Sequence, residues 1–430
     1  MRILSCFRAE TIRIAADRSA GTPAAASFAG VARSSPMVYE KSRSHAGEKS
    51  GKIMSAAFGP GILAQQDIRA LAETGAITPA RPFDADQIQP ASLDLRLGTV
   101  AHRVRASFLP GPDLSVEAKI RALTLHTVDL SRGAVLETGC VYIVPLMESL
   151  ALPAEISAGA NPKSSTGRLD VFTRVIVDQT RAFDTIPAGY HGPLYLEISP
   201  RTFPVLVRAG SRLSQIRFRV GDARLSDAEL TEVHARHTVV SGGDAVFQGG
   251  LTLSIDLDGG AWASTALPHH GDGGALVGWR AKRHTGVIDV DKKAALEVLD
   301  FWEPIVRRRD QRSLILDPDE FYILVSREAV HVPADYAAEM VPFDPLVGEF
   351  RVHYAGFFDP GFGAAEAGGR GARAVLEVRS HEVPFILDHG QTIGRLVYER
   401  MGKRPETLYG QGIGSNYQAQ GLKLSKHFRN

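Results

Sequence analysis

The strongest constraint on the fold of this chain is an internal repeat with a spacing of 180 residues. Residues 142–154 align with 322–334, and each segment runs from Tyr-Ile through an apolar stretch to Pro-Ala. Further on, the Leu-Glu pair that ends at Glu197 recurs, at the same spacing, in the pair that ends at Glu377. Self-similarity at a fixed spacing indicates a structural unit that occurs more than once. The sequence therefore predicts two tandem copies of one domain.

Charge separates an N-terminal segment from the rest of the chain. Residues 1–55 contain nine Lys or Arg and four Asp or Glu, whereas the remaining residues contain 40 basic and 44 acidic side chains. We expect this segment to be a disordered extension or a mis-assigned start, because its hydrophobic periodicity is weak and its four acids argue against a transit peptide. The mildly acidic remainder makes nucleic acid an unexpected partner. The predicted organisation is an N-terminal extension, a first domain, a diverged second domain and a C-terminal lid segment, at 1–55, 56–235, 236–404 and 405–430.

Short apolar runs between turn residues predict a mostly β fold. Gly, Pro and Asp separate many segments that are rich in β-branched and aromatic residues, a pattern typical of sandwiches and barrels rather than alternating β and α units. A short amphipathic helix is expected within 61–77, where it would end at Gly75. The expected strands include 92–97, 141–146, 171–177, 194–198, 205–207 and 216–220.

Cysteine content and hydropathy limit the classes of protein. No stretch approaches the roughly 18 consecutive apolar residues of a membrane helix, so we expect a cytoplasmic protein with no membrane partner. Cys6 and Cys140 are the only cysteines in the sequence. Zinc-dependent base deaminases hold their metal with a Pro-Cys-x-x-Cys motif, which two isolated cysteines cannot supply. Any deaminase chemistry would have to activate water with protein groups.

Two features could carry chemistry. Glu197 lies in an apolar run where side chains alternate between faces, so it is either a carboxylate on the wet face of a strand or a general acid/base in a desolvated pocket. Ser164, Ser165 and Arg168 follow Lys163 in a Lys-Ser-Ser-Thr-Gly-Arg loop. Hydroxyls and a guanidinium suit a bound anion, although the same residues would also serve as an ordinary helix cap with a surface arginine.

Four motifs in order resemble the dCTP deaminase family, in the dUTPase-like superfamily. They are the segments 88–98, 163–168, 196–197 and 416–426. The resemblance implies tandem distorted β-barrels of jelly-roll type with short helices, and a homotrimer with active sites between subunits. It also implies hydrolytic deamination of dCTP to dUTP and ammonia, and this dUTP would supply dTTP synthesis. The implied metal is Mg²⁺, bound through the substrate triphosphate, and no zinc is expected.

The resemblance also assigns site residues. Glu197 matches the catalytic glutamate that takes a proton from the water attacking C4 and passes it to the departing ammonia. Arg168 would hold that carboxylate, Ser164 would help to place the water, and Ser165 would meet phosphate. The remaining expected substrate contacts come from the loop, from the strand-like run after it and from the tail: Lys163, Thr180, Arg181, Asp184, Tyr417, Gln420 and Lys423.

The two copies depart from the family pattern in opposite ways. The first copy has Lys163 where members carry arginine, and its Asp-Pro-Gly-Tyr turn is expanded over 184–190. The second keeps that turn as Asp-Pro-Gly-Phe at 359–362 and keeps Glu377, but its window 340–351 has no serine. We therefore expect catalysis in the first domain. Glu377 is either vestigial or completes a site whose loop comes from elsewhere.

Two other functions stay open at this point. A dUTPase, or a bifunctional enzyme that carries dCTP on to dUMP, would use the aspartate of the Asp-Pro-Gly-Tyr turn, which is intact only in the copy without the phosphate loop. A nucleotide-binding regulator without turnover would have little use for a glutamate beside the base.

Overall fold

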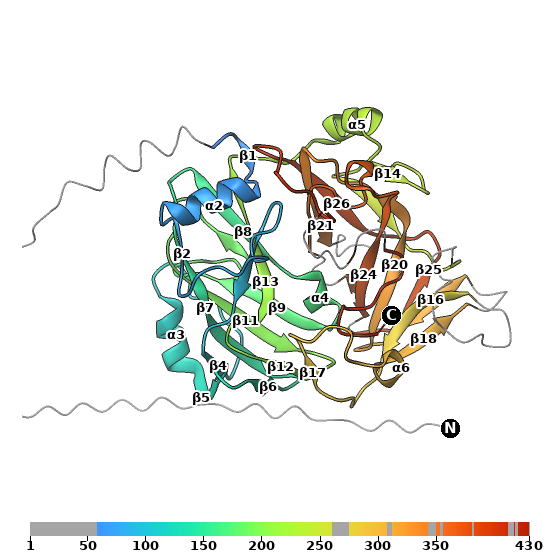
Figure 1. Cartoon of the computed structure of the whole chain (residues 1–430). Helices are drawn as coiled ribbons and strands as arrows, with labels where there is room; N and C mark the ends of the chain where they lie inside the picture. Colours follow the sequence, from blue (N-terminus) through green and yellow to red (C-terminus); the bar gives the residue numbers. More distant parts are fainter. Residues whose placement is uncertain are drawn as a thin grey trace, which may run out of the picture. The chain divides into compact units, whose positions relative to one another are not determined.

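Apolar alternation and turn glycines build the strands of the first domain largely where the sequence predicts them. In a computed structural model of the protein (Figure 1), the described residues are 58–259, 275–307, 312–342, 350–352, 356–380, 382–411, 417 and 420–429. The expectations for residues 1–55 and for Asn416 lie outside them. None of the helices in the described part of the chain has the length and apolar character needed to span a bilayer.

The first domain consists of short strands and three helices among the described residues. The predicted helix is present, and Gly75 follows its cap with a φ of 79°, a left-handed conformation that suits glycine. The helices are α2 (Gln65–Glu73), α3 (Val116–Leu123) and α4 (Ser164–Gly167). The strands are β1 (Gly61–Ile62), β2 (Ile77–Pro79), β3 (Leu93–Arg96), β4 (Val100–Val104), β5 (Thr124–Asp129), β6 (Ala134–Leu136), β7 (Val141–Ala151), β8 (Ile156–Pro162), β9 (Val171–Ile176), β10 (Thr185–Ile186), β11 (His191–Pro200), β12 (Val205–Val207) and β13 (Arg212–Val220).

The second domain also consists of short strands and short helices among the described residues. Its helices are α5 (Asp227–Arg236), α6 (Val298–Phe301) and the 3₁₀ turn Ala365–Ala367. Its strands are β14 (Val240–Ser241), β15 (Leu251–Ser254), β16 (Leu276–Ala281), β17 (Ile288–Asp289), β18 (Trp302–Val306), β19 (Ser313–Leu316), β20 (Phe321–Val330), β21 (Tyr336–Pro342), β22 (Phe350–Val352), β23 (Phe357–Phe358), β24 (Ala372–Ser380), β25 (Phe385–Asp388) and β26 (Thr392–Arg400). The chain is thus mostly β with short helices, as predicted.

Strand pairing confirms the repeat at the level of register. The first domain has one sheet with the order β5-β4-β7-β11-β9, and the second has β18-β16-β20-β24-β22. Glu197 on β11 lies opposite Ile143, and Glu377 on β24 lies opposite Ile323, so the two pairings differ by 180 at both positions. A second sheet is built around β13-β8 in one domain and β26-β21 in the other. The two glutamates therefore occupy equivalent places.

The boundary between the domains lies earlier than the predicted 235/236. The buried side chains of Leu230 and Val233 on α5 join the core of the second domain, together with Leu251 and Tyr398. Placing α5 in the first domain would have separated this helix from the core that it covers. The sequence of α5 does not predict this packing, because an amphipathic helix does not reveal which of two neighbouring cores it packs against.

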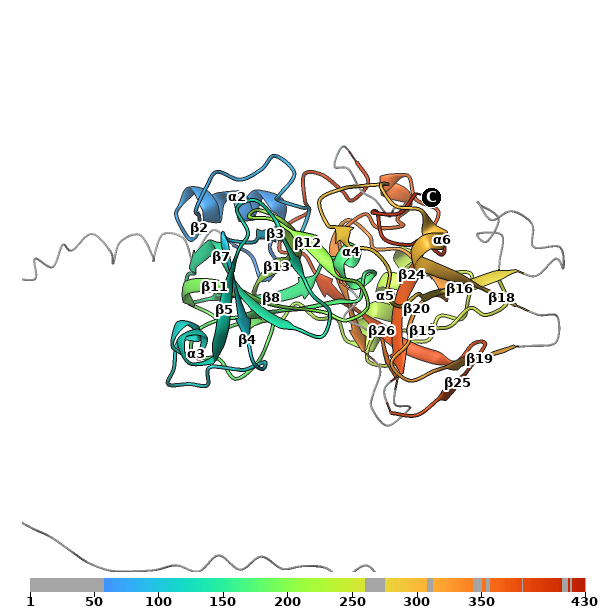
Figure 2. The same cartoon turned by 90° about the horizontal axis from the view of Figure 1, so that it is seen from below.

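The core of the first domain continues into the second. Phe203 lies edge to face with Trp302, at 5.5 Å between ring centroids, and Trp302 also contacts Phe428 of the C-terminal segment. Trp302 is fully buried. In Figures 1 and 2, α4 of the first domain lies beside β24 of the second. The predicted lid segment is thus part of the packed structure at its end, with Phe428 in the first core.

Buried ion pairs cross the same boundary. Arg379 on β24 binds the carboxylate of Asp170 and donates a hydrogen bond of 2.9 Å to the hydroxyl of Thr202, both in the first domain. A second pair runs in the opposite direction: Arg217 on β13 of the first domain forms an ion pair of 3.1 Å with Asp359 of the second domain. Removing one partner of such a pair leaves a buried charge without compensation.

We predict that Arg379→Met lowers the free energy of unfolding by about 3–5 kcal/mol, because the Asp170 carboxylate loses its buried cation. Urea unfolding followed by circular dichroism measures the change. The matched control is Arg69→Met, which removes an exposed pair with Glu406 at 2.7 Å and should cost about 0–1 kcal/mol. Equal effects for the two variants would contradict a stabilising role for the cross-domain pair.

Candidate active site

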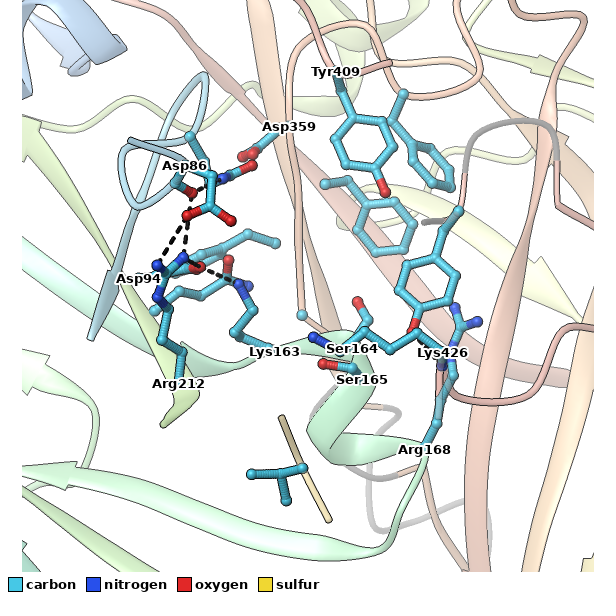
Figure 3. A pocket seen from close by; sticks show the side chains of 18 of the residues that line it. Asp86, Asp94, Lys163, Ser164, Ser165, Arg168, Arg212, Asp359, Tyr409 and Lys426 are labelled. Atoms are coloured by element: carbon cyan, nitrogen blue, oxygen red, sulfur yellow. Dashed lines mark hydrogen bonds and ion pairs between the residues drawn. The ribbon is translucent and has the colours of Figure 1, made fainter. Parts of the chain in front are cut away.

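The Lys-Ser-Ser-Thr-Gly-Arg segment forms a single helical turn at the end of β8. Lys163 caps α4 with extended backbone angles, and its carbonyl oxygen accepts hydrogen bonds from the amides of Thr166 at 2.7 Å and Gly167 at 3.1 Å. This turn directs Ser164 and Ser165 into a cavity (Figure 3). A short turn with hydroxyls at its start can present several hydrogen-bond donors to an anion.

Glu377 of the second domain approaches the backbone of this turn. A Cβ atom added to Gly167 would lie 2.2 Å from its carboxylate oxygen Oε2, a distance that no side chain can tolerate. Glycine at position 167 is therefore required for the approach. The site thus combines a loop of one domain with a glutamate of the other.

The Glu377 carboxyl group is almost completely buried. It is 2% exposed, and its Oε2 has no hydrogen-bond partner among the described residues. Burial raises the pKa of Glu377 to about 8, a shift that nearby Arg168 opposes and Asp170 reinforces. A carboxyl group with a pKa near the working pH can both accept and return a proton, which is what a general acid/base requires.

Arg168 connects this glutamate to the C-terminal segment. Its guanidinium donates to the carbonyl oxygen of Lys423 at 2.9 Å and to the side-chain oxygen of Gln420 at 3.0 Å. The guanidinium carbon also lies 4.0 Å from the ring centroid of Tyr417. The three tail residues that were predicted to contact the nucleotide therefore gather around Arg168.

The cavity has a volume of about 380 Å³, and residues of both domains and of the C-terminal segment line it. The predicted residues that line it are Lys163, Ser164, Ser165, Arg168, Tyr417 and Gln420. The second domain adds Glu377, Asp359, Phe362 and Lys293, and the segments after it add Tyr409 and Lys426. The described residues that line the cavity include no cysteine and no histidine.

The Asp-Pro-Gly-Phe turn of the second domain forms another wall of the cavity. Asp359 is held by Arg217, whose guanidinium also stacks on Phe357 at 4.0 Å. Burial raises the pKa of Asp359, and the charge of Arg217 opposes this effect. The intact turn and the phosphate loop, which the sequence assigned to different copies, therefore meet in one pocket.

The structure does not bring Glu197 to this pocket. Its Oε1 accepts two hydrogen bonds from Arg174 on β9, at 3.0 and 2.5 Å, and the guanidinium carbon of Arg174 lies 3.5 Å from the ring centroid of Phe183. On the same face of the sheet, Tyr195 packs with α3. The physical reason for the different placement is that the first domain covers its glutamate face with its own helix, whereas the equivalent face of β24 meets the neighbouring domain.

The strand-like run after the loop also lies away from the pocket. Thr180 bonds with the backbone of Ala182, Arg181 is exposed, and Asp184 accepts a hydrogen bond of 2.7 Å from the amide of Val175. Burial raises the pKa of Asp184 to about 7. These three residues lie on the side of the first domain that carries Glu197, and not beside Ser164.

Lys423 contributes its carbonyl oxygen to Arg168 but does not line the cavity.

The sequence left Glu377 and Asp359 open, included Lys426 in the tail motif without naming it as a contact, and missed Tyr409 and Lys293. The available signal was the repeat itself, which aligns Glu377 with Glu197 and shows that the loop is present in only one copy. A single loop can meet either glutamate, and only the packing of the domains decides between them.

Comparison with known proteins identifies the family. Residues 59–222 match the family model for the N-terminal domain of 2'-deoxycytidine 5'-triphosphate deaminase, and residues 226–428 match the model for its C-terminal domain. The second match begins at α5 and so agrees with the packing of that helix.

Individual proteins agree with these models. A "dCTP deaminase, dUMP-forming" of Thermobifida fusca is 30% identical over 157 residues, which are 36% of this chain and 76% of the relative. A dCTP deaminase of Haloarcula marismortui is 32% identical over 160 residues, 36% of this chain and 79% of the relative. The crystal structure of 2'-deoxycytidine 5'-triphosphate deaminase from Agrobacterium tumefaciens is 65% identical, covers 80% of this chain and 99% of its own, and superimposes with a TM-score of 0.74. The resemblance found in the sequence is thereby confirmed, and the chain belongs to the dCTP deaminase family, in a form with two tandem domains.

Proposed function

We propose that this chain hydrolyses dCTP to dUTP and ammonia in the pocket between its domains, with Glu377 as the general acid/base. The observation that carries the proposal is the convergence of the Ser164 to Arg168 loop on a buried glutamate of the other domain. Glu197, to which the sequence assigned this role, is paired with Arg174 and lies away from the loop.

The proposed chemistry uses the groups at the loop in a fixed order. Ser164 positions a water molecule against C4 of cytosine, and ionised Glu377 takes a proton from that water as its oxygen attacks. Glu377 then delivers the proton to the departing amino group, so that the C4–N bond breaks and ammonia leaves. The positive charge of Arg168 stabilises the ionised form of Glu377, which is the form that accepts the proton of the water.

The proposed reaction uses no zinc, and magnesium enters it only with the substrate. Its described walls lack the cysteine and histidine ligands that zinc prefers. The acidic residues Asp84 and Asp86 bind Arg212 at 2.6 and 2.9 Å, and Asp94 binds Lys163. Magnesium would therefore be held by the triphosphate of the substrate, as the family resemblance implies.

The distorted barrel and the homotrimer are part of the same proposal. The family resemblance places active sites between subunits, and here two domains of one chain supply the two halves of a site. A trimer of this chain would then add contacts around a site that is already assembled within each chain. Size-exclusion chromatography with light scattering tests the assembly without reference to activity.

We predict that Glu377→Gln lowers kcat by about 10²–10⁴-fold, because an amide cannot relay the proton. Glu197→Gln should keep most of the activity. Ammonia release from dCTP measures both, and circular dichroism establishes that each variant is folded. Loss of turnover in folded Glu197→Gln, with an active Glu377→Gln, would return the catalytic role to Glu197.

The raised pKa of Glu377 predicts a pH profile. Only the ionised carboxylate can accept the proton of the water, so kcat/KM should increase with pH and level off above about 8. Asp359→Asn serves as the control and should keep this inflection even if its absolute rate is lower. A profile that is flat from pH 6 to 9 in the wild-type protein would contradict the role of Glu377.

A second product is favoured by the position of Asp359. The sequence left dUTP hydrolysis open, with the intact turn and the phosphate loop in different copies, and residues of both line the same pocket. Several relatives, including that of Thermobifida fusca, are named for forming dUMP. We therefore propose, as the second candidate, that dUTP is carried on to dUMP and pyrophosphate with Asp359 activating the water.

Pyrophosphate release decides between the two products. If the second candidate holds, the wild-type protein releases pyrophosphate from dUTP, and Asp359→Asn loses this release by a larger factor than it loses ammonia release from dCTP. If neither dCTP nor dUTP yields pyrophosphate, dUTP is the end product. A protein that binds dCTP without releasing ammonia would instead be the non-catalytic regulator.

A further inference from the structure

A second cavity lies within the second domain. Its volume is about 380 Å³, and residues of β15, β20, β26 and the loop after β14 line it. None of its described lining residues belongs to the wall of the candidate active site. Cavities of this size hold small molecules. The proposed deamination leaves this cavity without a role.

Strand register shows which part of the first domain corresponds to this cavity. Ser254 pairs with Thr392 on β26, and Arg96 pairs with Arg212 on β13. The two partners are 180 residues apart, and both ladders have an irregularity beside this pair. Ser254 therefore occupies the place in the second domain that Arg96 occupies in the first.

A glutamate binds each of these two positions in the same way. The backbone amide of Arg96 donates to Oε2 of Glu148 at 2.9 Å, and the amide of Ser254 donates to Oε2 of Glu328 at 2.8 Å. In the first domain the glutamate also has a cation, because Nε of Arg96 lies 2.8 Å from Oε1 of Glu148. Serine supplies only its hydroxyl, which donates to Oε1 of Glu328. Glu328 is thus 4% exposed and has no ion pair with a cation of the described residues.

The cavity corresponds to the space that Arg96 fills in the first domain. Arg96 is fully buried, and its guanidinium donates to the carbonyl oxygens of Arg81 and Pro82, both at 2.8 Å, in the loop after β2. Since β14 pairs with β20 as β2 pairs with β7, the loop that carries Asp244 takes the corresponding place in the second domain. The shorter serine leaves this space open beside Glu328 and Asp244. This acidic end of the cavity is suited to a planar cation.

Two arginines give the same cavity a basic part. Arg327 and Arg395 line it, and neither forms an ion pair with a carboxylate of the described residues. Arg395 donates one long hydrogen bond of 3.4 Å to the carbonyl oxygen of Gln248, and its Nε has no hydrogen-bond partner within the described part of the chain. A Cβ atom at Gly390 would lie 3.3 Å from Nη1 of Arg327, so glycine leaves room for this guanidinium. Guanidinium groups bind carboxylates through paired hydrogen bonds, and these two can therefore hold the negative end of a ligand.

We propose that this cavity is a binding site for a small zwitterion with a guanidinium group at one end and a carboxylate at the other. The guanidinium of the ligand pairs with Glu328 as Arg96 pairs with Glu148, and its carboxylate binds Arg327 and Arg395. Both charges of the ligand contribute, because the cavity wall holds charges of both signs without ionic partners among the described residues. The site is separate from the pocket of the proposed deamination, so its test does not depend on that function.

L-Arginine is the probe for this site. Calorimetric titration of the full-length protein should detect its binding. L-Citrulline has a neutral urea group in place of the guanidinium, and L-arginine methyl ester lacks the free carboxylate, so each should bind at least about tenfold more weakly. The proposal is wrong if the wild-type protein does not bind L-arginine, or if it binds all three compounds equally.

Ser254→Arg tests the correspondence between the two domains. The introduced side chain can form with Glu328 the pair that Arg96 forms with Glu148, and it fills the cavity. We expect this variant to remain folded by circular dichroism and to bind L-arginine at least about tenfold more weakly. A folded variant with the affinity of the wild-type protein would contradict the proposal.

Arg395→Gln tests the basic part of the cavity and does not depend on the folding of Ser254→Arg. It should weaken the binding of L-arginine by about tenfold and leave that of the methyl ester unchanged, because the ester has no carboxylate for the guanidinium to bind. The matched control is Arg236→Gln, which removes an exposed arginine from α5 of the same domain and should bind L-arginine as the wild-type protein does. Equal affinities of Arg395→Gln and Arg236→Gln for L-arginine would also contradict the proposal.

Discussion

The pair between Arg379 and Asp170 sets the geometry on which the rest of the site depends. Arg379 stands two residues after Glu377 on β24, so both side chains project from the same face of the strand. Asp170 stands two residues after Arg168 at the end of the loop turn. One buried ion pair therefore fixes the strand that carries the glutamate against the loop that carries the serines. Because an uncompensated buried charge is costly, sliding of one domain along the other is opposed at this point.

The two glutamates show how one strand position acquires different properties. Glu197 is held by Arg174 beneath α3, in surroundings that the first domain supplies by itself. Glu377 has an equivalent register, but its neighbours are Gly167 and Arg168 of another domain, and burial raises its pKa to about 8. The fold thus fixes where each carboxylate stands, and the surface that covers it decides whether it is paired with an arginine, as Glu197 is, or buried with a raised pKa, as Glu377 is.

The sequence was informative wherever a feature depends on neighbouring residues. The strand around Glu197, the Ser164 to Arg168 turn and the 180-residue repeat all follow from local alternation, turn chemistry and self-similarity. The choice between Glu197 and Glu377 depends on which faces meet across the domain boundary, and no local pattern encodes this. One difference between the copies does bear on it. Arg379 aligns with Ser199, so only the second copy carries the cation that docks against the loop.

The contact of the C-terminal segment with the first domain has a consequence for folding. The hydroxyl of Ser425 donates to the carbonyl oxygen of Ser165 across 260 residues of sequence. Contacts of such long range form after the local structure of each domain, since closing a long loop costs entropy before it is rewarded. During synthesis the first domain leaves the ribosome long before the tail. A chain that has not yet reached the tail therefore lacks the side chains of Tyr417, Gln420 and Lys426 in the wall of the pocket.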